Sequence, residues 1–296
     1  MFVRIDHVMI CVPKLEAGIE QYRKLGFDMH PGGVHPGKGT HNAIAFNRDD
    51  YIELLAMHDR AEYEQASASL RRDDGALPAF VAAGGGIRYV IIQSDGLEAD
   101  IAAMRARGVE VSDVLAGSRR TLQGLELRWK AAVLGAANPL PLFFIEHLTP
   151  LEQRRTQFPG VRPHANGVQA IERAYIVTPD ANRTAAEYAK VLGMPQPALT
   201  KGTVIMSDMA VFQIGPNGLG IAQPYADGPA AEALARRGSG PFQALYRTSS
   251  MGAAAKWMQQ HGLPALPRGV RNTGEQAMLA PPDLAGGAYI GFVGPE

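Results

Sequence analysis

One repeated pattern constrains the fold of this chain more than any other feature. An apolar, β-leaning run is followed by an amphipathic helical stripe and then by a glycine, as in IDHVMICVPKLEAGIEQYRKLGF. Apolar residues in the stripe recur at spacings of three and four, which is typical of one helical face, and glycine ends helices readily. The pattern occurs four times, the last time weakly, with strand centre and glycine at nearly equal separations: His7 and Gly26, Tyr89 and Gly108, Arg173 and Gly193, Ala244 and Gly262.

Short strand-like runs complete each copy of the repeat. In the first copy they include HNAIAF and YIELLAM, separated by the turn NRDD. The unit therefore reads β-α-β-β-β, which predicts an α+β fold. Because one such unit leaves unpaired sheet edges, we expect the units to pair side by side. The polar, Pro/Gly-rich segment 149–167 then predicts a linker between a front pair of units, residues 1–157, and a back pair, residues 165–296.

Composition excludes several classes of partner. The 296 residues carry no net charge, whereas a nucleic-acid or anionic-membrane partner normally requires a basic excess. No apolar run approaches the roughly 18 residues of a membrane helix, and the N-terminal run lacks the basic segment of a signal peptide. Cys11 is the single cysteine, so no internal disulfide can form. We therefore expect a cytoplasmic protein with a small-molecule ligand.

The run PGGVHPGKGTHNAIAF contains the spacing G-x-x-x-x-G-K of a phosphate-binding loop. That motif needs Ser or Thr after the lysine, and the loop must join a strand to a helix. Here Gly39 follows Lys38, and the run leads from a short strand into another strand. A nucleotide site is therefore not expected. Two interpretations remain, a flexible structural loop at the rim of a site and a mobile lid over a substrate.

The phrases IDHVMICV, LEAGIEQYRKLGF and YIELL resemble the first strand, helix and last strand of the vicinal oxygen chelate superfamily. Its members include glyoxalase I, extradiol dioxygenases and bleomycin-resistance proteins. PGGVHPGKGTHNAIAF, FFIEHL and HANGV resemble more narrowly the glyoxalase-like domain proteins of that superfamily. The resemblance implies four βαβββ modules paired into two cup-shaped mixed sheets.

The resemblance also implies where a metal would bind. Enzymes of the superfamily place ligands in the middle of the first and last strands of paired modules. For the back pair these positions are Arg173, Gln213, Ala244 and Gly291, which form a degenerate site. For the front pair they are His7, Glu53, Tyr89 and Glu146. His7, Glu53 and Glu146 are therefore the expected metal ligands, and an imidazole with carboxylates suits Zn²⁺, Ni²⁺, Mn²⁺ or Fe²⁺.

Tyr89 departs from the pattern of the superfamily, where histidine is usual at this position. A neutral phenol is a poor metal ligand, so Tyr89 is expected to contact the substrate instead. His41 is the better candidate for a second imidazole near the ligand. His147 directly follows Glu146, so on a regular strand it should point to the opposite face. Glu53 and Glu146 are the expected catalytic residues, moving a proton on the substrate.

These assignments leave different functions open. The first is a glyoxalase-like metalloprotein or metalloenzyme with lyase or isomerase chemistry on a small α-oxygenated carbonyl compound. The alternative is a metal-free protein that binds or sequesters a small molecule, as bleomycin-resistance proteins do. A third is a scaffold whose back pair only supports a homodimer. His7 and Glu53 have a purely structural interpretation too, as hydrogen-bonded core residues.

Overall fold

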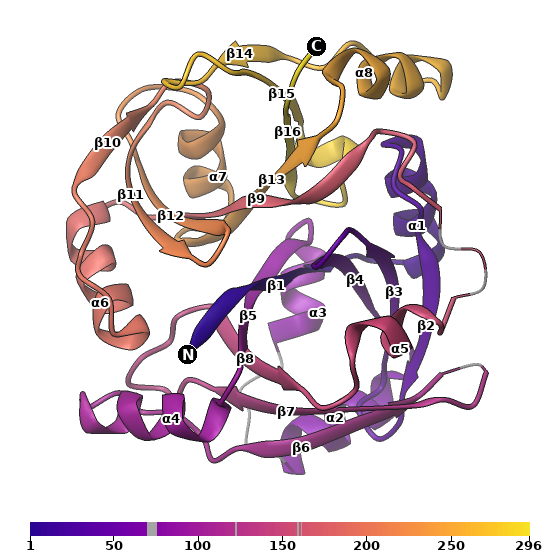
Figure 1. Ribbon diagram of the computed structural model, residues 1–296, viewed down its shortest axis with the longest axis vertical. Coiled ribbons are helices and arrows are strands. Elements are labelled where there is room, and N and C mark those ends of the chain that lie inside the picture. The colour runs from indigo at the N-terminus through magenta and orange to yellow at the C-terminus, as the bar shows by residue number, and fades with distance from the viewer. Residues whose placement is uncertain (70–75, 122, 159, 161) are drawn as a thin grey trace.

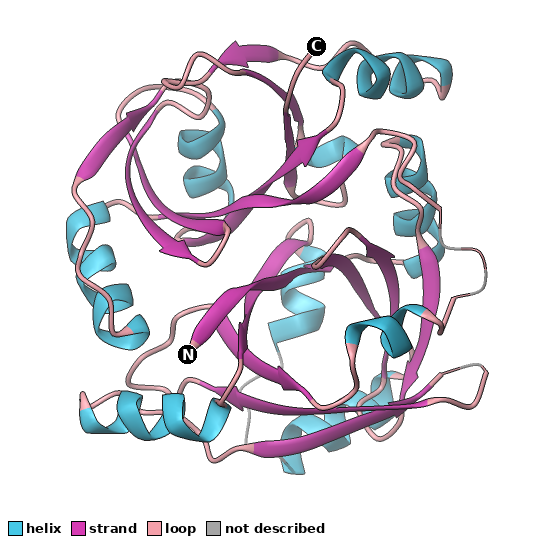
Figure 2. Ribbon diagram, viewed as in Figure 1, coloured by secondary structure: helices cyan, strands magenta, loops and turns pink. Residues whose placement is uncertain are grey.

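A computed structural model of the protein describes residues 1–69, 76–121, 123–158, 160 and 162–296 (Figure 1). Strands predominate, with short helices between them (Figure 2). No helix in these residues is long and apolar enough to span a membrane. The front half contains β1 (Phe2–Cys11), α1 (Leu15–Lys24), β2 (His30–His35), β3 (Thr40–Phe46), β4 (Tyr51–Met57), α2 (Arg60–Ser69), α3 (Ala76–Ala82), β5 (Gly86–Ser94), α4 (Leu97–Ala106), β6 (Leu115–Arg120), β7 (Glu126–Val133), β8 (Leu142–His147) and α5 (Leu151–Arg155). The back half contains β9 (Val168–Val177), α6 (Ala181–Leu192), β10 (Leu199–Gly202), β11 (Ser207–Ile214), β12 (Asn217–Pro224), α7 (Pro229–Arg237), β13 (Gly240–Thr248), α8 (Met251–Gln260), β14 (Arg268–Val270), β15 (Gln276–Ala280), a 3-10 turn (Pro282–Leu284) and β16 (Tyr289–Val293).

The described strands form two eight-stranded mixed sheets. Their orders are β2-β3-β4-β1-β5-β8-β7-β6 and β10-β11-β12-β9-β13-β16-β15-β14. Within a module the last strand runs parallel to the first, as β4 does to β1, while β1 pairs antiparallel with β5 to join two modules. The back sheet repeats this arrangement through β9 and β13. Each sheet curls into a cup (Figure 1), and the predicted fold of four paired βαβββ modules is confirmed.

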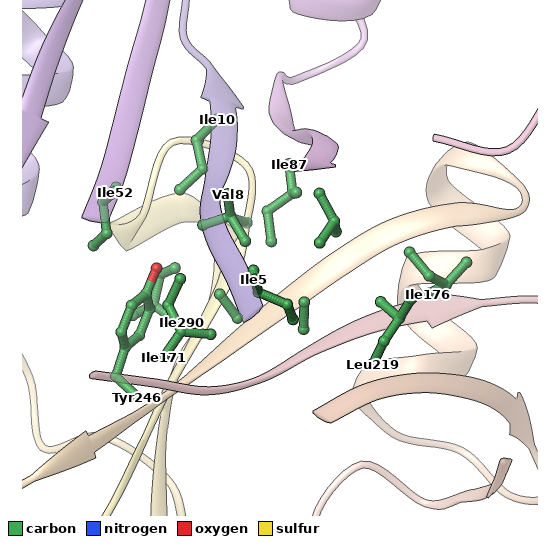
Figure 3. Packing of buried hydrophobic residues seen from close by; sticks show 14 of the residues in the cluster. Ile5, Val8, Ile10, Ile52, Ile87, Ile171, Ile176, Leu219, Tyr246 and Ile290 are labelled. Carbon is green, nitrogen blue, oxygen red and sulfur yellow. The ribbon is translucent and has the colours of Figure 1, made fainter. Parts of the chain in front are cut away.

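The convex faces of the two sheets pack against each other through one hydrophobic core (Figure 3). Ile5 and Ile87 of the front sheet and Ile171 and Ile290 of the back sheet are all fully buried there. A hydrogen bond crosses the same boundary, since the backbone N–H of Ile5 donates to Asn217 Oδ1 at 2.9 Å. The halves therefore share their core, and the division into separate domains at 1–157 and 165–296 stays a prediction.

The two cups differ in what fills their concave faces. Helix α7 lies within the curl of the back sheet (Figure 1). Its Ala230 and Ala233 belong to one buried apolar cluster with Phe242 and Leu245 of β13. The helix begins at Pro229, and proline is favoured at the first helical position. The back cup is thus filled by the chain itself.

Residues 31–40, for which the sequence leaves both a flexible rim loop and a mobile lid open, form part of strand β2 and a tight turn, and the role of a lid stays a prediction. β2 pairs with β3 along this segment. The Glu62 carboxylate then accepts hydrogen bonds from the backbone N–H groups of Gly37 and Gly39, at 2.5 and 3.0 Å. Gly39 has a φ of +63°, and a Cβ there would collide with the backbone of Asp59 and Tyr63. The turn therefore requires this glycine for steric reasons.

Strand register corrects two of the four positions predicted for the back pair. The last strand of the third module is β12, so Gln213 on β11 is one strand too early. Gly220 of β12 pairs with Tyr175 as Glu53 pairs with Met9, and it therefore matches Glu53. Ala244 pairs with Ala174 at the centre of the β9–β13 ladder and faces the shared core, so Gln243 matches Tyr89. The corrected set is Arg173, Gly220, Gln243 and Gly291.

The shared core predicts that the two halves unfold together. Ile5→Ala and Ile290→Ala should each lower the free energy of unfolding by about 2–5 kcal/mol, since each leaves a cavity in that core. Urea unfolding followed by tryptophan fluorescence and by circular dichroism should show one coincident transition in both variants. The matched control is Val270→Ala, at an exposed position, with an expected change within about 0.5 kcal/mol. Two separate transitions would instead mean that the halves are independent domains.

Candidate functional site

The front cup encloses a cavity of about 560 Å³, a size typical of small-molecule sites. Alternate residues of β3 face it, because successive side chains on a strand point to opposite faces. These are Thr40, Asn42, Ile44 and Phe46. Aromatic and aliphatic side chains from the other strands form most of the remaining wall, among them Leu55, Tyr89, Ile91, Trp129 and Phe143.

Two buried polar side chains on adjacent strands line this cavity, and we call them the floor pair. His7 of β1 and Glu53 of β4 approach to 3.3 Å between Nε2 and Oε2. Asn42 Nδ2 donates to Glu53 Oε1 at 2.6 Å. The ring of Tyr51 stacks on the imidazole with centroids 4.2 Å apart. The sequence prediction that His7 and Glu53 lie together is thus met by the geometry.

Asp6 lies behind the floor pair and is fully buried. Its Oδ2 is 2.8 Å from His7 Nδ1, and its Oδ1 is 3.0 Å from His147 Nε2. The pairing of β1 with β5 shifts register between Ile5 and His7. Such a bulge inserts one residue and turns its side chain out of the regular alternation. The side chains of two consecutive residues, Asp6 and His7, can therefore point into the same polar cluster and bond to each other.

The charges of this cluster follow from its hydrogen bonds. Burial alone would lower the pKa of His7, but its bonds to Asp6 and Glu53 raise that pKa to about 9. Burial alone would raise the pKa of Glu53, but the hydrogen bond and charge of His7 lower it to about 2. Burial also opposes the shift at Asp6, where His147 and His7 hold the pKa well below its usual range. At neutral pH His7 is therefore an imidazolium donating to two carboxylates.

Glu146 and His147 occupy the reverse of their predicted faces. Glu146 Oε2 accepts from the backbone N–H of Leu97 at 2.8 Å, at the start of α4, where a carboxylate is favourable. His147, in contrast, lines the cavity. Phe143 is the residue that matches Glu53, because Phe143 pairs with Ile91 as Glu53 pairs with Met9. The assignment of Glu146 as a metal ligand and catalytic residue is corrected accordingly.

The structure places His41 and Tyr89, the two residues expected to bind substrate, in different surroundings, and only Tyr89 lines the cavity. His41 lies on the outer face of β3, with its ring 5.1 Å from that of His58, and it does not line the cavity. Its neighbours Thr40 and Asn42 point inward, so strand alternation excludes His41 from the cup. Tyr89 does line the cavity, its ring edge-on to Phe143 at 5.1 Å. Ligand binding by Tyr89 stays a prediction.

The donor set of the cup does not fit a metal ion. Within the described part of the chain, no three His, Cys, Asp or Glu side chains are grouped so as to hold one. The floor pair offers one nitrogen and one carboxylate, whereas Tyr89 and Phe143 stand at the matching positions of the second module. Catalytic zinc sites, by comparison, take three protein ligands.

The segment after β8 supplies polar residues that the sequence assigned to a linker. Arg154 of α5 and Gln157 just beyond it are buried and line the cavity. Gln157 Oε1 accepts from Arg119 Nη2 at 2.7 Å, and Arg119 also donates to the carbonyl oxygen of Gly32. Arg119 thereby joins β6 to β2, the two edge strands of the front sheet. The sequence contains only a weak indication that these residues line a site, namely an arginine and a glutamine three residues apart on one helical face.

A second cavity, of about 610 Å³, lies between the halves and is lined by four arginines. Three of these arginine side chains have partners, and Arg48 Nε lies 3.9 Å from Asp49 Oδ2. Arg155 donates to the carbonyl oxygens of Asn47 and Arg48, while Arg247 pairs with Glu172 and Glu275. The contacts of Arg48 and Arg155 lie within the front half and those of Arg247 within the back half. Because these cations already have partners, the front cup with its buried floor pair is the better candidate site.

Comparison with known proteins agrees with this architecture. A family model described as "Glyoxalase-like domain" matches residues 5–192. No curated protein matches the sequence significantly. Among solved structures, a hypothetical protein from Staphylococcus aureus is 14% identical, with 99% of this chain and 100% of that chain covered at a TM-score of 0.69.

Two further solved structures carry names that describe an activity. A mutant of 4-hydroxymandelate synthase from Streptomyces coelicolor is 11% identical over 100% of this chain and 93% of that one, with a TM-score of 0.63. The Mn(II)-bound glyoxalase from Novosphingobium aromaticivorans is 12% identical over 99% and 82%, with a TM-score of 0.58. At such identities the likeness establishes the fold, that of the vicinal oxygen chelate superfamily. With the family model covering more than half of its length, the chain belongs to the glyoxalase-like domain family.

Proposed function

We propose that the protein binds a small oxygenated organic molecule in the front cup through its own side chains, without a protein-bound metal. The observation that supports this is the floor pair, His7 and Glu53, set in an otherwise largely apolar cavity of about 560 Å³. Apolar walls with a few convergent polar groups are typical of ligand sites. A cytoplasmic location and a homodimeric state also stay predictions from the sequence.

A hydroxyl group on the ligand could hydrogen-bond to the floor pair. Glu53 accepts one hydrogen bond at each carboxylate oxygen, from Asn42 and from His7. A carboxylate offers about four acceptor positions in all, so it retains lone pairs for an O–H of the ligand. The neighbouring aromatic rings of Tyr89, Phe143 and Trp129 would contact the apolar part of the same molecule.

Proton transfer, as in isomerase or lyase chemistry, is the second candidate. A continuous path from His147 through Asp6 and His7 to Glu53 favours it. A general base is most effective when its pKa lies near the working pH. The pKa of Glu53 is about 2 and that of His7 about 9, so neither meets this condition in the free protein. Binding is therefore the function that the geometry supports best.

The first test concerns the ligand itself. Trp129 lines the cavity, so its fluorescence should respond to small hydroxylated aromatic compounds such as benzyl alcohol and phenol. Ala131→Phe, which fills the cavity from β7, should weaken that response at least about tenfold by steric exclusion. Ser118→Phe, on the outer face of β6, is the matched control and should bind as the unaltered protein does. Equal binding by Ala131→Phe would place the ligand elsewhere, and α-deuterium incorporation into a bound ligand would revive proton transfer.

The second test concerns metal. Protein purified without a metal-affinity tag and equilibrated with Mn²⁺, Zn²⁺, Ni²⁺ or Fe²⁺ should retain well under one ion per chain, because no three His, Cys, Asp or Glu side chains of the described residues are grouped to hold one. Elemental analysis after gel filtration measures this. Glu53→Gln should leave the metal content unchanged. One ion per chain in the unaltered protein, lost in both His7→Ala and Glu53→Gln, would restore the metalloprotein interpretation.

The third test concerns pH. His7 has a pKa of about 9 when folded, against about 6.5 when unfolded. Its contribution to stability is therefore full below about pH 6.5 and is lost as pH rises through about 9. The free energy of unfolding should fall by up to about 3 kcal/mol across that window. An NMR titration gives the pKa directly, with buried His164, whose pKa burial lowers to about 4, as internal control. A His7 resonance that titrates near 6.5 would contradict the charge assignment.

A further inference from the structure

The front cup contains a buried cation without a described counter-ion. Arg154 is only 7% exposed and lines the cavity. Its Nε is buried without a hydrogen-bond partner, and its guanidinium takes part in none of the ion pairs among the described residues. A buried charge left uncompensated is strongly unfavourable, so proteins normally pair such groups. This arginine therefore points to a negative charge that the described residues do not supply.

The side chains around Arg154 do not neutralise its positive charge. Glu53 is the single carboxylate among the described cavity-lining residues, and it is already bonded to the imidazolium of His7. The neighbouring guanidinium of Arg119 has neutral hydrogen-bond partners, the Gly32 carbonyl and the Gln157 amide. Among the described residues, Arg154 and Arg119 therefore bring two buried guanidinium groups without a carboxylate partner to the side of the cup formed by α5 and β6.

This side adjoins the floor pair. Burial and the charges of Asp6 and Glu53 raise the pKa of Tyr51, and the nearby charge of Arg154 opposes them. Tyr51 in turn stacks on His7. One small molecule can therefore contact both regions, with an anionic group at Arg154 and a polar group at Glu53.

We propose that Arg154 binds the carboxylate of the ligand, and that the ligand of the front cup is a small organic carboxylate with an apolar body. The inference rests on the proposed function, since it names the class of molecule that the cup takes. The planar guanidinium matches the two oxygens of a carboxylate, and such charge-assisted pairs are strong. A carboxylate would neutralise the charge of Arg154, and Trp129, Phe143 and Ile91 provide the apolar wall.

The experiment compares charged and neutral ligands of the same shape on the full-length protein. Benzoate, phenylacetate and hexanoate are each titrated against the corresponding primary amide, with inorganic phosphate as a further arm. Trp257, which stacks on His261 outside the cup, is replaced by Phe so that fluorescence reports Trp129 alone. The variants are Arg154→Met and Arg154→Lys. Arg120→Met, at the exposed neighbour of Arg119, is the matched control.

The unaltered protein should bind at least one carboxylate about 10- to 100-fold more tightly than its amide. Arg154→Met should abolish that preference while changing amide affinity by less than about twofold, and Arg154→Lys should restore part of it. Without ligand, Arg154→Met should unfold at an equal or higher urea concentration, because it removes an uncompensated buried charge. A purely structural arginine would instead make this variant less stable.

The outcomes separate the two proposals. Equal affinity for carboxylate and amide, or a preference that survives in Arg154→Met, overturns the assignment of Arg154 and leaves binding in the cup intact. Tighter binding of phosphate than of any carboxylate also overturns the ligand class. If neither carboxylates nor amides change the fluorescence of Trp129, the proposed binding function fails as well.

Discussion

The antiparallel pairing of β1 with β5 determines where the rest of the front half can lie. It joins two modules that would each have an unpaired sheet edge, and it produces one continuous eight-stranded sheet. The convex face of this pair carries Ile5 and Ile87 into the core shared with the back sheet. The concave face carries His7 and Tyr89 into the cup. One ladder thus creates both the junction between the halves and the centre of the candidate site.

The same architecture gives two cups with different contents. In the back cup the equivalent positions hold Arg173, Gly220, Gln243 and Gly291, and α7 packs into the curl. In the front cup the first module keeps His7 and Glu53, while the second has Tyr89 and Phe143. A metal shared between modules needs donors from both, whereas a ligand held by packing and hydrogen bonds does not. The remaining donors therefore suit the binding function proposed for the front cup.

Much of this could be predicted from the sequence, because the repeated strand, helix and glycine act locally. The apolar run around His7 and the stop at Gly26 follow from propensity and periodicity alone. Glu146 and His147 show where such reasoning fails. Strand alternation has a period of two, so an alignment in error by an odd number of residues exchanges the two faces. The bulge at Asp6 could not be predicted either. Its register shift depends on how β1 pairs with β5 and not on the residues near Asp6.

The segment between the halves was the least predictable, and it connects the filled back cup to the open front one. Its residues lack a long apolar period, so the sequence indicated only a polar linker. In the structure, His164 bonds to Asn47 at 2.9 Å, and the Asn166 amide donates to the Leu25 carbonyl at 2.9 Å. These bonds fix the C-terminal end of the crossing to the front half, and Thr149 Oγ1, which accepts from the backbone N–H of Arg128 at 2.8 Å, fixes the other end. Both ends of the segment that carries Arg154 are therefore held by the front half itself, which places this arginine beside the cavity.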